Sequence, residues 1–164
     1  MTRFKYISIA IIIATLLQTT LMDYLAIGGI KPLLLLAVSI CAVLDFGVVS
    51  GCITGVICGL IMDITSGGGV GLSSLILLYI CIVCGLLCPK IFKEKVSVVV
   101  LFTLTSTFIF EFIYAFLLFF VWGKGSMVFL LFSRIIPESL YTSIFAIPIF
   151  LIFKRVKNVE WMDN

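Results

Sequence analysis

Histidine is absent from the sequence, and only 12% of the residues are charged. Without histidine the chain cannot form a Ser-His-Asp triad, and it lacks the side chain that most often binds a metal ion. The few carboxylates form no pair beside a water-facing pocket, so we predict no catalytic residues. These absences argue against an enzyme.

Apolar residues dominate the composition. They make up 63% of the 164 residues, and the mean hydropathy is +1.35, whereas ordinary soluble domains are closer to half apolar. The apolar segments run almost from end to end, which leaves no room for a separate soluble domain. We therefore predict one integral membrane domain over residues 1–164, surrounded by the lipid bilayer.

Six apolar segments follow one another along the chain, separated by charges, prolines and glycines. A helix needs about 20 residues to cross the hydrocarbon core of a bilayer, and most of the segments approach that length. We predict an all-α bundle of six transmembrane helices. They cover about 4–22, 32–44, 47–63, 71–88, 96–122 and 127–153, and residues 154–164 form a polar tail.

Basic residues decide how the segments cross the membrane. The segments 32–44 and 47–63 are short enough to form one helix instead, which would leave five spans. With six spans and both termini in the cytoplasm, the basic residues of the outer loops are Lys31 and Lys124, and those of the termini and inner loops are more numerous. Cytoplasmic loops normally carry the excess of Lys and Arg, so we predict six spans and a cytoplasmic tail.

Glycines recur at every fourth position in the third segment, "GVVSGCITGVICGLIMDITSGGGVG" at 47 to 71. Gly47, Gly51, Gly55 and Gly59 lie along one inclined ridge of a helix and make a groove without side chains. In lipid, close backbone packing through small residues is a main source of helix association. The groove therefore accepts either a helix of the same bundle or the transmembrane helix of a partner.

Asp63 occupies the next interval of this pattern, at the C-terminal end of the helix, where the macrodipole disfavours a negative charge. We predict that it accepts hydrogen bonds from backbone N–H groups in the following turn, which contains Gly67, Gly68 and Gly71. It would then act as a structural latch. The alternative is a carboxylate that binds an ion or a ligand.

Three further charges fall inside predicted spans, at Glu111, Arg134 and Glu138. Glu111 and Glu138 come to nearly the same depth in antiparallel segments, and Arg134 shares a helix face with Glu138. Buried charges in a membrane pair with one another or mark a functional site. We expect a network that fixes the bundle, with a proton or transport site and a partner-facing network as the alternatives.

All six cysteines also fall inside predicted spans, and "CIVCGLLC" at 81 to 88 has the CxxC spacing of some metal and redox sites. Without histidine and at membrane depth, the cysteines are better explained as small packing residues. We predict no metal and no cofactor. The net charge of +3 comes from the inner loops and gives no reason to expect a nucleic-acid partner.

The stretch "GVVSGCITGVICGLIMDITSGGGVGLSSL" resembles the signature of the rod shape-determining protein MreD family. "KPLLLLAVSI" at 31 to 40 and "YTSIFAIPIFLIFKRV" at 141 to 156 extend the resemblance over nearly the whole chain. Two positions depart from the family pattern. Leu33 stands where an acidic residue is common, and Thr142 stands where an Asn is common.

The resemblance implies a non-enzymatic scaffold of the bacterial cell-elongation complex, which makes peptidoglycan, located as a multi-pass protein in the cytoplasmic (inner) membrane. Its partner would be MreC, which has a single transmembrane helix. The same assembly would connect MreB filaments to RodA and a penicillin-binding transpeptidase. We place the MreC helix against the segments 47–63 and 71–88 as a hypothesis, and a homo-oligomer stays open.

A second class of membrane protein has a similar size and number of spans, namely the substrate-binding membrane subunit of an energy-coupling-factor-type vitamin importer. Such a subunit needs a polar cavity open to the outside. The outer loops "DYLAIGGIK", "ITSGGGVG" and "GKGS" offer few side chains for a polar ligand. Binding would depend on Asp63, Glu111, Arg134 and Glu138.

Overall fold

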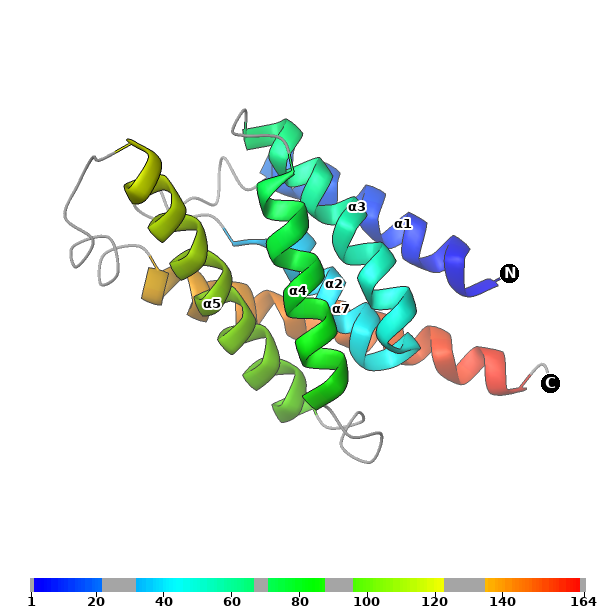
Figure 1. The fold of residues 1–164 in the computed structure, drawn as a ribbon. Coiled ribbons are helices and arrows are strands. Elements are labelled where there is room, and N and C mark those ends of the chain that lie inside the picture. Colours follow the sequence, from blue (N-terminus) through cyan, green and yellow to red (C-terminus); the bar gives the residue numbers. More distant parts are fainter. Residues whose placement is uncertain (1, 22–31, 67–70, 88–95, 123–134, 163–164) are drawn as a thin grey trace.

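The computed structural model describes residues 2–21, 32–66, 71–87, 96–122 and 135–162, and within these ranges the chain is all-helical (Figure 1). This confirms the predicted all-α class. Six α-helices and one π-helical turn follow in order: α1 (Thr2–Leu16), η1 (Leu17–Leu21), α2 (Leu34–Phe46), α3 (Val48–Ser66), α4 (Leu72–Leu87), α5 (Val96–Trp122) and α7 (Ile136–Met162).

Three of these helices are long and apolar enough to cross a membrane, over Val48–Thr65, Val96–Leu117 and Ile136–Lys154. The other apolar helices of the described ranges are shorter, at Ile7–Thr20, Leu34–Phe46 and Leu72–Leu87. Six spans and cytoplasmic termini therefore stay predictions.

Helix α2 forms the centre of the bundle. Every residue from Leu34 to Leu44 is buried, because α1, α3, α4, α5 and α7 all contact this helix. A helix that is apolar on all sides is stable only where other helices surround it. Figure 1 shows α2 behind α4, enclosed by the longer helices.

Helices α2 and α3 are separate, although only Gly47 lies between them. The N–H of Gly47 donates to the carbonyl oxygen of Val43 at 3.1 Å, and its φ of 97° ends the helix. Residues with a side chain rarely adopt this φ. Gly47 is thus a turn residue between two helices, and the alternative of one long helix over both segments is wrong.

Several helix ends differ from the sequence prediction by a few residues, and two differ by more. The segment predicted as one helix over 4–22 ends in the π-helical turn η1, in which the Oε1 of Gln18 accepts a hydrogen bond from the N–H of Leu35. Helix α7 continues past residue 153 to Met162. The predicted end rested on apolarity, whereas helix propensity does not require apolar residues. Residues 127–134 of the predicted last segment lie outside the described ranges.

Candidate functional site

The glycine ridge of α3 faces the interior of the bundle. Gly51, Gly55 and Gly59 are buried, whereas Ile53 and Ile57 on the opposite side of the helix are exposed. The neighbours of the ridge are α4, against which α3 packs most extensively, and α2. Figure 1 shows α3 and α4 side by side along most of their length.

Each of these three glycines lies against an atom that leaves no space for a side chain. A Cβ on Gly51 would lie 2.7 Å from the Cα of Val43 in α2, and one on Gly55 would lie 2.8 Å from the Sγ of Cys81 in α4. A Cβ on Gly59 would lie 2.6 Å from the backbone nitrogen of Ser74. The last contact is the most restrictive, because backbone cannot move aside as a side chain can.

The groove along Gly51, Gly55 and Gly59 is therefore occupied by helices of the same chain. Gly47, the first glycine of the predicted ladder, has a different role: a Cβ there would meet nothing within 4 Å, and the residue is needed for its positive φ. Of the two occupants considered from the sequence, the described structure has the internal one at these three glycines.

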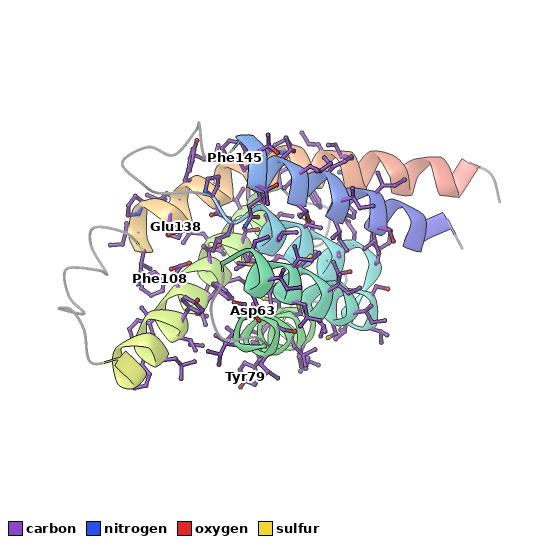
Figure 2. The ribbon with its side chains drawn as sticks, turned by 90° about the horizontal axis from the view of Figure 1, so that it is seen from above. Asp63, Tyr79, Phe108, Glu138 and Phe145 are labelled. Atoms are coloured by element: carbon purple, nitrogen blue, oxygen red, sulfur yellow. The ribbon has the colours of Figure 1, made fainter. Side chains whose placement is uncertain are left out.

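Asp63 connects the end of α3 to the start of α4. The carboxylate is only 3% exposed. Its Oδ2 accepts a hydrogen bond from the N–H of Gly71 at 2.7 Å, and its Oδ1 accepts one from the N–H of Ser73 at 3.1 Å. The first N–H groups of a helix have no partner within the helix, and the positive end of the α4 dipole favours a negative charge there. Figure 2 shows Asp63 inside the bundle.

The glycines and Asp63 work as one structural unit. Gly59 lies one helical turn before Asp63 and brings α3 against the backbone of Ser73 and Ser74. The Oγ of Ser74 also donates to the carbonyl oxygen of Val56 at 3.2 Å. Close approach at Gly59 thus places the carboxylate within reach of the first turn of α4. Gly67 and Gly68, which were predicted to form part of this turn, lie outside the described residues.

Sequence reasoning did not single out Ser73 or Ser74. The available signal was their position in the first turn of the helix that begins after Gly71. Gly71 itself has a φ of +102° and open space around its Cβ position, so its backbone conformation, and not crowding, calls for glycine.

The two carboxylates of the predicted charge network are buried on neighbouring helices. Glu111 of α5 is 9% exposed and Glu138 of α7 is 3% exposed, and α5 packs against α7. Neither is without an interaction partner. Glu138 lies in the first turn of α7, where the helix dipole favours it (Figure 2). Arg134 lies outside the described residues, so its predicted pairing with Glu138 stays a prediction.

The start of α2 is capped by side chains from two other elements. The hydroxyl of Thr142 in α7 donates to the carbonyl oxygen of Glu138 at 2.8 Å and accepts from the N–H of Leu33 at 3.1 Å. Gln18 of η1 accepts from the N–H of Leu35 at 3.1 Å. Leu33, at the N-cap position, provides no side-chain cap of its own. The two positions that depart from the family pattern therefore contact each other.

The described cysteines are free thiols: Cys41, Cys52, Cys58, Cys81 and Cys84. Within the described ranges, no three His, Cys, Asp or Glu side chains come together as ligands for a metal ion. Cys88 lies outside these ranges. Cys84 and Ser106 form a hydrogen bond at 3.2 Å between α4 and α5.

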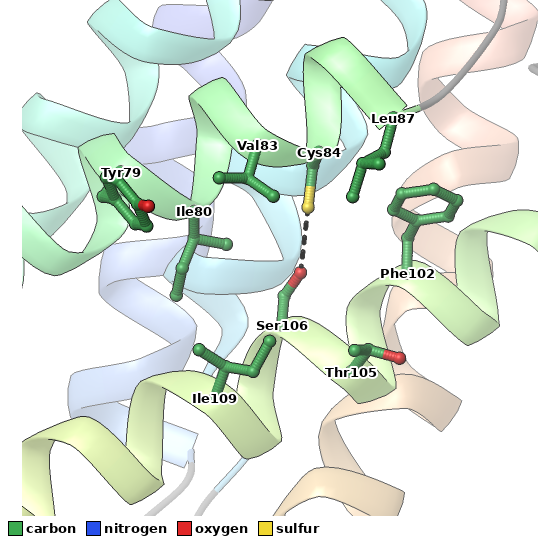
Figure 3. Close-up of a pocket in the computed structure, with 9 residues that line it drawn as sticks. All are labelled: Tyr79, Ile80, Val83, Cys84, Leu87, Phe102, Thr105, Ser106 and Ile109. Carbon is green, nitrogen blue, oxygen red and sulfur yellow. Dashed lines mark hydrogen bonds between the residues drawn. The ribbon is translucent and has the colours of Figure 1, made fainter.

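Two grooves between helices are lined by residues that the structure describes. One, of about 320 Å³, is bounded by α1, α2 and α7 and is lined by apolar side chains that include Val38, Phe145 and Pro148. The other, of about 110 Å³, lies between α4 and α5 around Cys84 and Ser106 (Figure 3). Neither brings Asp63, Glu111 or Glu138 into its lining.

Comparison with protein families gives a match over nearly the whole chain. The family model described as rod shape-determining protein MreD matches residues 1–158. Neither a curated protein nor a solved structure matches the chain. The matched residues include the glycine ridge, Asp63 and the helices long enough to cross a membrane, which identifies a membrane protein concerned with cell shape. The chain belongs to the rod shape-determining protein MreD family.

Proposed function

We propose that this protein is a non-enzymatic scaffold of the cell-elongation complex and crosses the cytoplasmic membrane of a bacterium six times. The observation that carries the proposal is the family match, which spans residues 1–158 of the 164. The arrangement of the helices supports it, since the start of α1 and the end of α7 lie on the same side of the bundle in both views (Figures 1 and 2). An even number of crossings puts both ends of a chain on one side.

A scaffold must hold its own helices in fixed positions, and the polar groups of the bundle serve that purpose. Asp63 binds the first turn of α4, and Thr142 with Gln18 caps α2. In this proposal Asp63 is a structural latch. Glu111, Arg134 and Glu138 form a network that fixes α5 against α7.

The partner in the membrane is MreC, which binds through its transmembrane helix. MreB, RodA and a penicillin-binding transpeptidase belong to the same assembly. The glycine ridge holds α2 and α4 at Gly51, Gly55 and Gly59, so the partner helix must lie on another face of the bundle.

The vitamin importer gains no support from the described grooves. A polar ligand loses its bonds to water on binding, and unpaired polar groups in an apolar site are costly. The surface that lines both grooves is apolar. Asp63 is already hydrogen-bonded to α4.

The test is purification of the tagged protein from its native membrane in a mild detergent, followed by mass spectrometry of every protein and small molecule that accompanies it. A tagged, unrelated multi-span protein from the same membrane serves as the control. We expect MreC and cell-wall synthases with the tagged protein and not with the control. Recovery of a pair of ATPases or a stoichiometric vitamin would contradict the proposal.

A further inference from the structure

Helices α4 and α5 lie next to each other but leave a groove between them. In the view of Figure 1 they lie close where α4 ends and α5 begins, and they spread apart toward the start of α4. The hydrogen bond between Cys84 and Ser106 joins the two helices in the groove. Val83 lies near this bond, and Tyr79 lies farther along the groove lining (Figure 3).

Tyr79 has an unusual position for a tyrosine of a membrane helix. It lies about 10 Å from the start of α4 and about 12 Å from its end at 1.5 Å per residue, and it is 67% exposed. Tyrosine is normally enriched at the membrane surface, where its hydroxyl meets water and lipid headgroups. In the six-span arrangement proposed above, the hydroxyl of Tyr79 lies at the level of the hydrocarbon.

No hydrogen bond to the Tyr79 hydroxyl comes from the residues that the structure describes. The neighbouring hydroxyls of Thr105 and Ser106, in contrast, have hydrogen-bond partners. The Thr105 hydroxyl donates to the carbonyl oxygen of Leu101 at 2.9 Å, and the Ser106 hydroxyl is hydrogen-bonded to the Cys84 thiol. A hydroxyl without a hydrogen bond in an apolar medium costs free energy, and lipid tails offer no partner for it.

We propose that the groove between α4 and α5 receives one transmembrane helix of a partner protein, with a hydrogen-bonding side chain at the level of Tyr79. The proposal rests on the function proposed above, in which MreC supplies a membrane helix. A helix fits these observations better than an acyl chain, because it carries polar side chains at chosen depths. The small side chains of Cys84 and Ser106 allow close approach of a helix backbone.

The first test compares two neighbouring substitutions in the full-length protein. Val83→Trp fills the groove, whereas Ile82→Trp places the same side chain on an exposed position of α4 outside the groove lining. Each variant is produced together with MreC and purified, and the amount of MreC per chain is measured. We expect Val83→Trp to lower it roughly tenfold and Ile82→Trp to leave it unchanged.

Three results of this test have distinct meanings. Equal recovery of MreC with both variants would overturn the groove as the docking site while leaving the proposed function intact. Absence of MreC from the wild-type preparation would overturn the proposed function and, with it, this inference. If Val83→Trp fails to accumulate, the second test decides.

The second test introduces the photo-crosslinking residue p-benzoylphenylalanine, which resembles tyrosine in shape, at Tyr79. The matched control position is Ile57, an exposed residue at the middle of α3. We expect a crosslink to MreC from Tyr79 and none from Ile57. Crosslinks to a second copy of this chain, equal crosslinks from both positions, or none from Tyr79 while MreC co-purifies would each overturn the proposal.

A conservative variant isolates the hydroxyl. Tyr79→Phe keeps the ring and removes one oxygen atom, and we expect MreC recovery to fall about threefold, the effect of a typical hydrogen bond between membrane helices. An unchanged recovery would remove the hydrogen bond from the proposal.

Discussion

Helix α4 meets α3 on one side and α5 on the other, and the two contacts differ in kind. Against α3 the backbones approach so closely at Gly59 that no side chain fits, and the Asp63 carboxylate binds the first turn of α4. Against α5 a groove stays open around the hydrogen bond between Cys84 and Ser106, and the Tyr79 hydroxyl has no bond within the described part of the chain. On one face of α4 the protein's own helix α3 fills the space and accepts the hydrogen bonds. On the other face a partner helix would fill the open groove and bind the Tyr79 hydroxyl.

This difference shows how a membrane protein can separate stability from recognition. Lipid supplies little hydrophobic driving force between helices, so stability comes from close packing and from hydrogen bonds. Both are concentrated between α3 and α4. The face of α4 toward α5 has fewer of these contacts, so it contributes less to stability and is available to another helix.

The largest effect is expected from Gly59→Leu, because the new side chain would meet the backbone of Ser73 and Ser74. We expect a loss of about 3 kcal/mol of unfolding free energy, at the upper end of the overpacking range. The measurement is the yield and unfolding midpoint of the purified protein. Leu60→Phe, at an exposed position of the same helix, should change neither, and equal effects of the two variants would show that the contact is not tight.

A somewhat smaller effect is expected from Asp63→Leu, which leaves the N–H groups of Gly71 and Ser73 without an acceptor. Loss of about 2 kcal/mol is expected for unpaired buried donors. Asp63→Asn keeps one oxygen and should lie between wild type and Asp63→Leu in a denaturation series. If Asp63→Asn abolished cell-shape activity with unchanged stability, the carboxylate would have a ligand-binding role in place of the latch.

Gly71→Ala should cost about 1 kcal/mol, since the φ of +102° is strained for a residue with a side chain while the space around it is open. Asn tolerates positive φ better than Ala, so Gly71→Asn should be the milder of the two. The unfolding midpoints of these two variants separate backbone strain from crowding. The reverse order would argue against strain as the reason for glycine.

The smallest effect is expected on the open side of α4. Ser106→Ala removes the hydrogen bond to Cys84, and we expect a loss of about 0.5 kcal/mol, typical of a single polar contact between membrane helices. A loss as large as that of Asp63→Leu would show that the α4–α5 contact also holds the bundle together.

Local features of the fold could be predicted from the sequence, and pairings between distant segments could not. Apolar segment lengths predicted the helices, and charge topology favoured two helices where Gly47 divides α2 from α3. The hydrogen bonds of Asp63 to the turn after α3 follow from the helix dipole and nearby glycines, all within one hairpin. The spacing of glycines along one helix does not specify which neighbouring helix packs against them. The contact of Gly51 with Val43 therefore had to come from the structure.

The cap of α2 shows the same limit more clearly. Leu33 and Thr142 are far apart in the sequence, and each was noted only as a departure from a family pattern. The hydrogen bond between them depends on how α7 packs beside α2. The continuation of α7 to Met162 was missed for another reason, because the boundary was drawn where apolarity ended and not where helix propensity ended.

The glycine ridge of α3 holds the protein's own helices in place. The most direct test is the unfolding free energy of the purified chain without any partner, for the wild type and for Gly55→Leu. Gly55 faces Cys81 of α4, so we expect Gly55→Leu to destabilise the isolated chain by about 2 kcal/mol. If the Gly55→Leu chain were as stable as the wild type and lost only MreC binding, the ridge would be a partner site and not an internal packing surface.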